Sequence, residues 1–294
     1  MKKDGSVGVR AVDNLSWSAH GGKKPMSVNG HTAASEKYGH ESIDALCAAM
    51  ESFFKRLGEI PALWKGDVDA AFRRIPVRPE HRWACGFAFK AAQQLFCAFH
   101  AACPFGALAS GHAWERIGEA LSFIARKLLM LPVLRYVDDF FAPERKESMQ
   151  YTMKSFAERV SVLLSADALK EEKLECGLSL DILGIQVSPS AGGYRLQPSA
   201  DKVPQWLLAL ELACDRLWPG ESKKLSGKLS WGGGAIFRRL GRAMLRPLYD
   251  QAGRRDGKVS PELRRALPWW IQVLEMEIVE TRAWLQPHRH PVHL

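Results

Sequence analysis

The spacing of apolar positions changes several times along the first half of the chain, and each change predicts a different element. Over 41–58 apolar residues recur every three or four positions, which predicts an amphipathic helix ending at a glycine. A compact apolar run at 63–68 predicts a strand that then turns, and the aromatic-rich stretch 83–102 predicts a β-hairpin. A Pro-Phe-Gly turn opens the stretch 104–131, which continues with the period of a long helix.

The second half continues this alternation until the pattern changes near Pro198. The sequence LRYVDDFFA at 134–142 predicts two strands joined by a turn, and 147–168 predicts a helix. One strand is expected over 180–189, and a turn with a short strand is expected over 190–199.

From Asp201 onward the pattern predicts helices only, whereas residues 1–40 predict loops and short strands. One face of the first of these helices is expected to carry the apolar residues Val203, Leu207, Leu210, Cys214 and Leu217. The sequence therefore predicts a mixed α/β part followed by an all-helical part.

Composition and charge add a partner class to this picture. The chain has 294 residues, of which 47% are hydrophobic, so it can bury a large core and fits two or three modules. Its net charge of +9 and pI of about 9.3 favour a polyanionic partner, with nucleic acid first and an anionic membrane second. Residues 220–265 hold twelve basic and four acidic side chains, which is +8 of that charge, so phosphate contacts are expected there.

Two absences in the sequence bear on location. No run of 18 apolar residues occurs, so a membrane span is not expected. The first fourteen residues lack an apolar core, so a signal peptide is not expected either. The six cysteines form no CxxC pair and indicate reduced thiols in an intracellular protein of the cytoplasm or nucleus.

The adjacent carboxylates Asp138 and Asp139 lie inside an apolar run, where two like charges are costly unless a cation neutralises them. Divalent metal ions suit such a cluster, and two Mg²⁺ ions can clamp both oxygens of a phosphoryl transfer. The alternative is an ordinary hairpin turn, because aspartate favours turns.

A third carboxylate is available in KGDVDAAF, after the strand predicted at 63–68. Alternation along a strand puts Asp67 and Asp69 on the same face, so spacing alone does not choose between them.

Five segments in order resemble the polymerase domain of reverse transcriptases, in particular those of retrotransposons of the tyrosine-recombinase type and related retroelements. The first three are GDVDAAFRRIPV, CPFGALASGHAWERI and YVDD. The fourth and fifth lie within EEKLECGLSLDILGIQV and are a lysine and then a Leu-Gly strand. KKDGSVGVRAVDN resembles the fingers strands, and KKLSGKLSWGGGAIFRRLGRAMLRPLY resembles the helices after the palm.

The resemblance implies an α+β fold: a right-hand polymerase palm and fingers with an antiparallel sheet and packed helices, followed by a helical thumb-like module. The implied domains are 1–64 for part of the fingers, 65–197 for the palm with further fingers residues, and 198–294 for the thumb-like or connection-like module.

The resemblance also chooses Asp67, because it lies five residues before Phe72 as the family's catalytic aspartate lies before its aromatic residue. The implied catalytic residues are Asp67, Asp138 and Asp139, and with Val68 they are the implied ligands of two Mg²⁺ or Mn²⁺ ions. Asp69 has no role in the family pattern, which leaves solvent exposure or a salt bridge.

The implied substrate contacts are Phe72, Phe105, Gly106, Tyr136, Lys3, Arg10 and Lys173. Phe72 would exclude a ribose 2′-OH or would simply be a core residue. Lys173 would donate a proton to pyrophosphate or would be a solvated lysine, and Lys3 and Arg10 would bind triphosphate or be surface cations.

The implied nucleic-acid contacts are Leu183, Gly184, Arg238, Arg242 and Arg246. The three arginines recur every four residues, so on a helix they form a phosphate-binding stripe or a solvated face. The sequence as a whole predicts an RNA-directed DNA polymerase that adds dNTPs to a template-primer. An inactive retroelement remnant and a non-catalytic nucleic-acid-binding palm are the alternatives, and no oligomeric state is predicted.

Overall fold

The computed structural model describes residues 13–16, 27–33, 37–235, 241–276 and 279–285. These residues form two compact units, which are described separately. The first unit contains the described residues up to His40 together with Gly66–Phe140 and Lys154–Leu174. The second contains Glu41–Lys65, Phe141–Met153 and the described residues from Glu175 onward.

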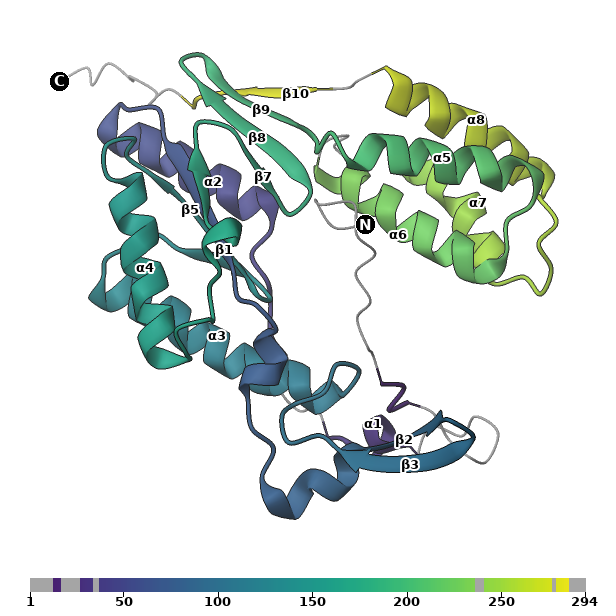
Figure 1. Ribbon diagram of the computed structural model, residues 1–294. Helices are drawn as coiled ribbons and strands as arrows, with labels where there is room; N and C mark the ends of the chain where they lie inside the picture. Colours follow the sequence, from purple (N-terminus) through teal and green to yellow (C-terminus); the bar gives the residue numbers. More distant parts are fainter. Residues whose placement is uncertain (1–12, 17–26, 34–36, 236–240, 277–278, 286–294) are drawn as a thin grey trace. The chain divides into compact units, whose positions relative to one another are not determined.

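The first unit contains the candidate carboxylates Asp67, Asp138 and Asp139, and Figure 1 shows its helices and strands. Its elements are α1 Val28–His31, η2 Ala71–Arg74, η3 Pro79–Cys85, β2 Gly86–Ala91, β3 Gln94–Phe99, α3 Leu108–Leu128, β4 Leu134–Tyr136 and η4 Glu171–Lys173. Three further elements, β1 Ala62–Asp67, β5 Asp139–Glu144 and α4 Met149–Leu163, have residues in both units.

The second unit is a sheet with one covering helix, followed by four helices. Its elements are α2 Ile43–Leu57, β6 Glu175–Gly177, β7 Leu180–Ile182, β8 Ile185–Ser190, β9 Gly193–Pro198, α5 Lys202–Asp215, α6 Pro219–Ala235, α7 Arg242–Ala252, α8 Pro261–Glu275 and β10 Glu280–Ala283. Along all the described ranges, no helix combines the length and the apolar content that crossing a bilayer requires.

One sheet has the strand order β4-β5-β1-β6 and carries the carboxylates at its strand ends. In β1, Leu63 and Trp64 are fully buried, and in β5 Phe140 and Phe141 are buried as well. Strands buried on both faces read as continuous apolar runs rather than alternating ones, which is why the sequence pattern located both of them.

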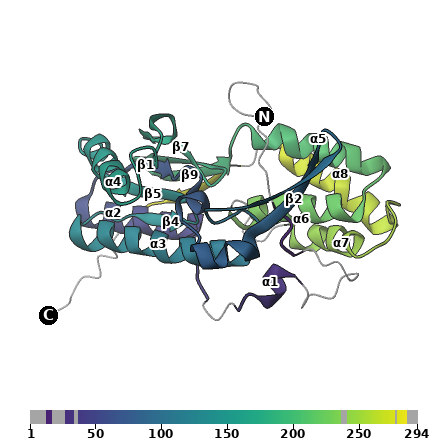
Figure 2. The same cartoon turned by 60° about the horizontal axis from the view of Figure 1, so that its bottom comes forward.

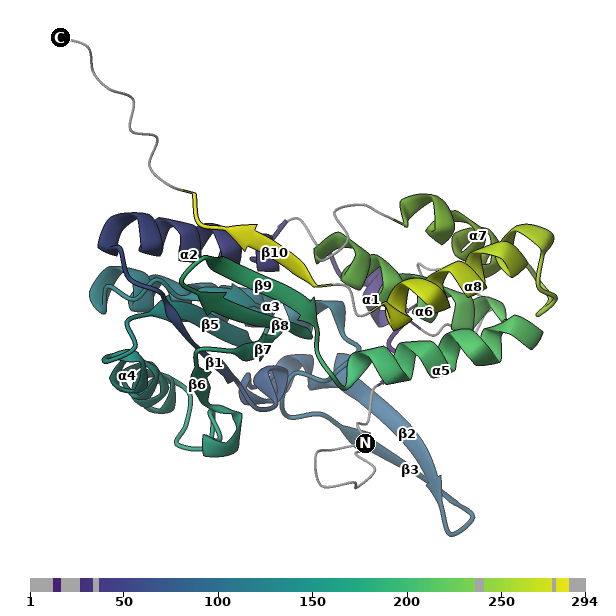
Figure 3. The ribbon, with the colours of Figure 1, turned by 90° about the horizontal axis from the view of Figure 1, so that it is seen from above.

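The second sheet is antiparallel with the order β10-β9-β8-β7 (Figure 3). Helix α2 contacts it through several side chains, among them those of Glu51 and Phe54. The Tyr194 hydroxyl on β9 donates to Oε1 of Glu51 at 2.6 Å, and the ring of Phe54 stacks on Trp284 at 4.6 Å. The buried positions of α2, including Met50, recur at the helical spacing that the sequence showed.

The four C-terminal helices pack as pairs, α6 on α7 and α8 on both α5 and α7. Close approach depends on small residues. A Cβ at Gly232 would lie 2.8 Å from the Trp206 ring, and one at Gly241 would lie 2.6 Å from the buried Trp270 ring. These contacts explain two glycines that would otherwise weaken a helical region.

Several predicted elements are confirmed with small shifts of their ends. Residues 83–102 contain the β2–β3 hairpin, 134–142 contain β4 and β5 with a tight turn, and 147–168 contain α4. In the region 1–40, the described residues form the short helix α1 and no strand, so the predicted short strands are not seen there.

The single strand predicted over 180–189 is wrong, because the segment folds as a hairpin. Ile182 pairs directly with Ile185, and the two residues between them have positive φ angles, 52° at Leu183 and 78° at Gly184. A two-residue turn of this kind matches the twist of the flanking strands. The turn was not predicted from the apolar pattern because Leu183, an apolar residue, occupies one of its two positions.

Two predictions about the C-terminal part are also wrong. It is not entirely helical, since β10 returns to pair with β9 at the edge of the second sheet. The buried face of α5 is centred on Trp206, Leu210 and Ala213, while Cys214 is exposed. Of the five predicted residues, Leu210 and Leu217 are buried and Val203 and Leu207 are half-buried, so only Cys214 is misplaced.

Candidate nucleic-acid polymerase site

Asp67 and the Tyr-Val-Asp-Asp turn are neighbours in the first unit. Asp67 ends β1, and the next residue, Val68, donates its backbone N–H to the carbonyl oxygen of Asp138 at 3.0 Å. The side chains of Asp67, Asp138 and Asp139 are all half-buried. Residues that are 71 positions apart (138 − 67) therefore lie at adjacent strand ends, as the sequence suggested.

Val137, in the middle of that turn, has a φ angle of +54°. A β-branched residue in this region is strained by about 1–3 kcal/mol, and such strain persists only where neighbours fix the backbone. Here two buried side chains do so: Nε1 of Trp114 and a guanidinium N–H of Arg135 donate to the Val137 carbonyl at 2.8 and 2.9 Å.

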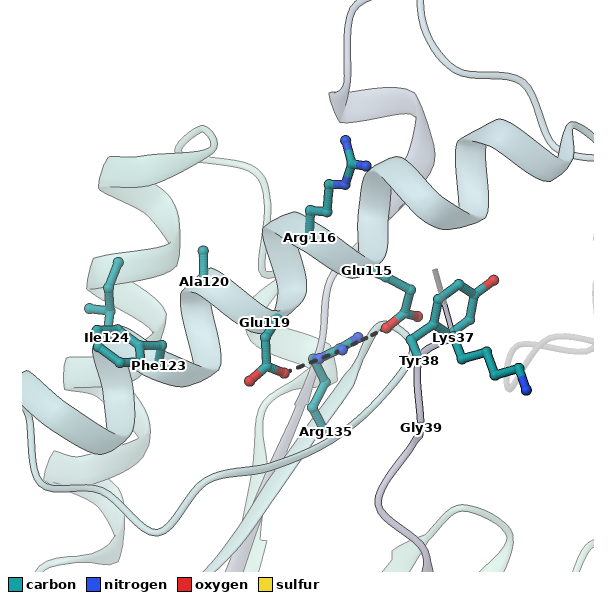
Figure 4. A pocket seen from close by; sticks show the side chains of 10 residues that line it. All are labelled: Lys37, Tyr38, Gly39, Glu115, Arg116, Glu119, Ala120, Phe123, Ile124 and Arg135. Atoms are coloured by element: carbon teal, nitrogen blue, oxygen red, sulfur yellow. Dashed lines mark hydrogen bonds and ion pairs between the residues drawn. The ribbon is translucent and has the colours of Figure 1, made fainter. Parts of the chain in front are cut away.

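Arg135 is held in turn by α3 (Figure 4). Its guanidinium lies 2.6 Å from Oε2 of Glu115, with both side chains buried, and 3.8 Å from Oε2 of Glu119. Gly118 makes room for this pairing, because a Cβ there would lie 2.8 Å from the guanidinium. A buried pair with good geometry tolerates little movement, so it fixes β4 and the turn against α3.

The same residues border an open cavity of about 880 Å³. It is lined by Lys37, Tyr38, Gly39, Glu115, Arg116, Glu119, Ala120, Phe123, Ile124 and Arg135, as Figure 4 shows. The cavity lies on α3 and the segment before α2, and the Asp67 carboxylate is not among its lining groups.

Lys173 forms ion pairs with two carboxylates, those of Asp67 and Asp69. Its Nζ lies 2.5 Å from Oδ2 of Asp67 and 3.1 Å from Oδ1 of Asp69, and Nζ of Lys170 lies 3.2 Å from Oδ2 of Asp69. Partial burial works against both charged forms, but these contacts raise the pKa of Lys173 above its usual value and lower that of Asp69 below its own. Asp69 thus forms ion pairs with both lysines.

Metal ligation was the predicted role of Asp67, Val68, Asp138 and Asp139. Carboxylate oxygens are the donors that Mg²⁺ and Mn²⁺ prefer, and a cationic ammonium already lies against Asp67. Within the described part of the chain, however, no three His, Cys, Asp or Glu side chains are grouped closely enough to hold an ion. A metal ion at Asp67 would compete with the Lys173 ammonium for that carboxylate.

Phe72 and Phe105, two predicted nucleotide contacts, lie together. Phe72 is in η2, directly after β1, and its ring centroid is 5.2 Å from that of Phe105. Both rings are half-buried, and the Arg73 guanidinium lies 5.9 Å from the Phe105 ring. The pair forms a rigid aromatic surface beside the end of β1.

Gly106 has a φ angle of +98°, and a Cβ there would lie 1.9 Å from the carbonyl oxygen of Asp13. The Asp13 N–H donates to the Phe105 carbonyl at 3.1 Å. The Asn29 side chain donates to the Gly106 carbonyl and accepts from the Leu108 N–H, both at 2.8 Å. Asn29 was not predicted, because nothing in its sequence neighbourhood points to a partner 77 residues away.

The remaining predicted substrate contacts are placed only in part. Tyr136 is half-buried at the end of β4, with its ring 5.1 Å from that of His40. Lys3 and Arg10 lie outside the described residues. Their predicted contact with a triphosphate therefore stays a prediction.

The predicted nucleic-acid contacts lie in the second unit. Leu183 and Gly184 form the β7–β8 turn, where Nε1 of Trp231 donates to the Leu183 carbonyl at 2.9 Å. Arg242 and Arg246 are both exposed on α7, whereas Leu245 of the same helix is buried. Arg238 lies outside the described residues, so two of the three arginines of the expected stripe are placed.

The chain has no match among models of protein families or among curated proteins. It does match solved structures of a foamy viral protease–reverse transcriptase. The one in complex with RNA/DNA hybrid has a TM-score of 0.50 and 16% identity, and the match covers 73% of this chain and 27% of that one.

Two further structures of that viral protein, in complex with double-stranded DNA, each have a TM-score of 0.55 and 15% identity. The matches cover 85% and 90% of this chain but only 40% and 49% of the viral chains, so the protein spans less than half of their length. At this identity the likeness concerns the fold. The chain has the palm-and-fingers fold of reverse transcriptases.

Proposed function

We propose that the protein is an RNA-directed DNA polymerase of a retroelement, which transfers deoxynucleotidyl groups from dNTPs to a primer 3′-OH with release of pyrophosphate. The observation that carries this proposal is the hydrogen bond from the Val68 N–H to the Asp138 carbonyl, at 3.0 Å. It brings Asp67 beside the Tyr-Val-Asp-Asp turn within a reverse transcriptase fold, where carboxylates from two strand ends serve phosphoryl transfer.

In this proposal Asp67, Asp138 and Asp139 hold two Mg²⁺ or Mn²⁺ ions, which when bound supply charge neutralisation at the phosphates. The turn that carries Asp138 and Asp139 is fixed in advance by the donors to the Val137 carbonyl. Lys173, released from Asp67, is a cation next to the site and can donate a proton to the leaving pyrophosphate.

Phe72 would select deoxynucleotides. Its ring is braced by Phe105, so it cannot easily rotate away from a ribose 2′-OH. An aromatic side chain excludes the ribose 2′-OH of a ribonucleotide by steric clash. This exclusion is effective only when neighbouring residues hold the ring in place.

The partner is proposed to be a template-primer of RNA and DNA. The matched viral structures were solved with RNA/DNA hybrid or with double-stranded DNA. In this chain the positive charge is concentrated in residues 220–265, which include the exposed Arg242 and Arg246 on α7. Exposed arginines four residues apart can follow a phosphate backbone.

The test is dNTP incorporation on a primed RNA template with Mg²⁺ or Mn²⁺. The Asp138→Asn/Asp139→Asn variant is expected to lose incorporation by a factor of about 10³ or more, because amides cannot supply the negative charge. The matched control is Asp215→Asn/Asp250→Asn, which removes two exposed carboxylates from α5 and α7. Full incorporation by the first variant would overturn the proposal.

One observation favours a second function, binding without polymerisation. Lys173 lies against Asp67, and the described residues contain no assembled group of three metal ligands. A non-catalytic palm would bind template-primer in a filter assay and incorporate no dNTP with either metal. That outcome would replace the polymerase proposal with this one.

A further inference from the structure

The β2–β3 hairpin is a two-stranded ribbon (Figure 2). It carries apolar residues on both faces. Leu95 and Phe99 are 74% and 60% exposed, and Phe89 and Phe96 are 46% and 42% exposed. Among the described residues no third strand pairs with it. An isolated ribbon with so much exposed apolar surface is marginal in water, so a binding partner is expected.

Alternation divides these side chains between two faces. Phe87 and Phe89 of β2 share one face with Phe96 of β3, because Phe89 and Phe96 are directly paired. Their rings are stacked, with centroids 5.9 Å apart at 24° for Phe87 and Phe89, and 5.4 Å apart at 17° for Phe89 and Phe96. Leu95 and Phe99 lie on the opposite face.

A series of contacts links these rings to the candidate nucleotide contacts through His100 and Arg73. The His100 ring stacks on Phe87 at 4.5 Å and 23°, and its Nδ1 lies 2.7 Å from a guanidinium nitrogen of Arg73. That guanidinium lies 5.9 Å from the Phe105 ring, which is in contact with Phe72. All of these residues belong to the first unit.

We propose that the face formed by Phe87, Phe89 and Phe96 binds unpaired bases of a single-stranded template. Every base has a flat face that stacks on an aromatic ring, so a row of rings binds single strands with little sequence preference. The row ends at Phe105 and Phe72, which makes it a path by which a template strand approaches the nucleotide. This inference rests on the proposed function.

The charge around the hairpin favours a polyanion over a second copy of the chain. Between residues 78 and 100 the charged side chains are Arg78, Arg82 and Lys90 against the single acid Glu80, with His81 and His100 in addition. Two copies meeting at this segment would bring like charges together. Lys90 lies on the opposite face with Leu95, whereas Arg78 and Arg82 precede the hairpin. A nucleic acid strand would supply bases for the rings and phosphates for these neighbouring cations.

The experiment measures binding of fluorescently labelled twelve-nucleotide RNA and DNA single strands to the full chain by anisotropy, with no metal and no dNTP. The Phe89→Leu/Phe96→Leu variant keeps apolar side chains but removes the rings, so it is expected to bind about tenfold or more weakly. The matched control, Leu95→Ala/Phe99→Ala, changes the opposite face and is expected to bind within about twofold of the unchanged protein. Circular dichroism of each variant checks that it is folded.

Ring replacement adds a positive control, since Phe89→Trp/Phe96→Trp should bind at least as tightly as the unchanged protein. Equal weakening by both face variants would overturn the proposal, and so would unchanged binding by Phe89→Leu/Phe96→Leu. Sedimentation would also overturn it if the protein were a dimer that this variant dissociates. The Asp138→Asn/Asp139→Asn variant should keep single-strand binding, so failure of the polymerase proposal is distinguishable.

Discussion

Nζ of Lys173 lies 2.5 Å from Oδ2 of Asp67, where a metal-dependent polymerase would need a cation of another kind. The ammonium is also 3.1 Å from Oδ1 of Asp69, so it keeps one partner if it leaves the other. Asp69 would therefore still hold Lys173 near the site if Asp67 bound a metal ion, a role that the family pattern does not give it.

The first prediction follows from this competition. Lys173→Gln should strengthen Mn²⁺ binding to the protein without nucleotide, as measured by electron paramagnetic resonance or calorimetry. Because both side chains are about one-third exposed, the pair is worth less than about 1 kcal/mol, so the gain is at most about fivefold. The control is Lys170→Gln, which removes a cation that faces Asp69 only. An equal gain in the control would contradict this assignment.

The second prediction concerns the strained turn. Val137→Gly should leave the free energy of unfolding unchanged or raise it, because relief of about 1–3 kcal/mol of strain offsets the entropy that glycine adds to the unfolded chain. Val133→Gly, at a fully buried position without a positive φ angle, should lower it by more than about 2 kcal/mol. Urea denaturation measures both, and a large loss in Val137→Gly would show that the strain estimate is wrong.

The third prediction concerns acid stability. Hydrogen bonds from Arg74 and then Ser165 lower the pKa of Asp167 from 3.8 to about 2. A carboxyl group whose pKa is lowered by folding stabilises the folded state at pH values above its ordinary pKa. This contribution is lost as the pH falls from about 4 toward 2.

Arg74→Gln should therefore reduce the dependence of stability on pH within that window. Urea denaturation at pH values from 5 to 2 tests this. Lys146→Gln removes a positive charge from an exposed position and serves as the control. If the two variants gave the same slope, the Arg74–Asp167 pair would not be responsible.

The fourth prediction is that the cysteine thiols differ in how fast they are alkylated. Burial raises the pKa of the Cys47 thiol to about 11, so little reactive thiolate is present at pH 8. Cys97 and Cys214 are exposed. Alkylation with iodoacetamide, followed by mass spectrometry, should modify Cys97 early and Cys47 last. Early modification of Cys47 in folded protein would contradict the burial of α2 against the second sheet.

Much of the fold was predictable because it depends on local patterns. The buried strands β1 and β5 appear as apolar runs, and the aromatic hairpin and the helices α2, α3 and α4 have clear periods. The closeness of Asp67 to the Tyr-Val-Asp-Asp turn was inferred from residue types and from family resemblance, and the Val68–Asp138 hydrogen bond agrees with it.

The features that were missed depend on contacts between distant segments. The positive φ of Val137 has no sequence signal, because it is imposed by Trp114 and Arg135 from outside the turn. Strand β10 was missed because its residues Glu280–Ala283 alternate too weakly to show a strand, and their pairing with β9 is tertiary. Propensity is a weak guide where tertiary contacts decide.

The contact between Gly106 and Asp13 has a consequence for the order of folding. The Pro-Phe-Gly turn is closed by the backbone of Asp13 and by the side chain of Asn29, whose bond to the Gly106 carbonyl spans 77 residues. Contacts so far apart in sequence close late, since the entropy of the intervening loop opposes them. During synthesis, residues 13–16 and 27–33 must therefore wait until residues 105–108 have emerged from the ribosome, and only then is the Pro-Phe-Gly turn closed.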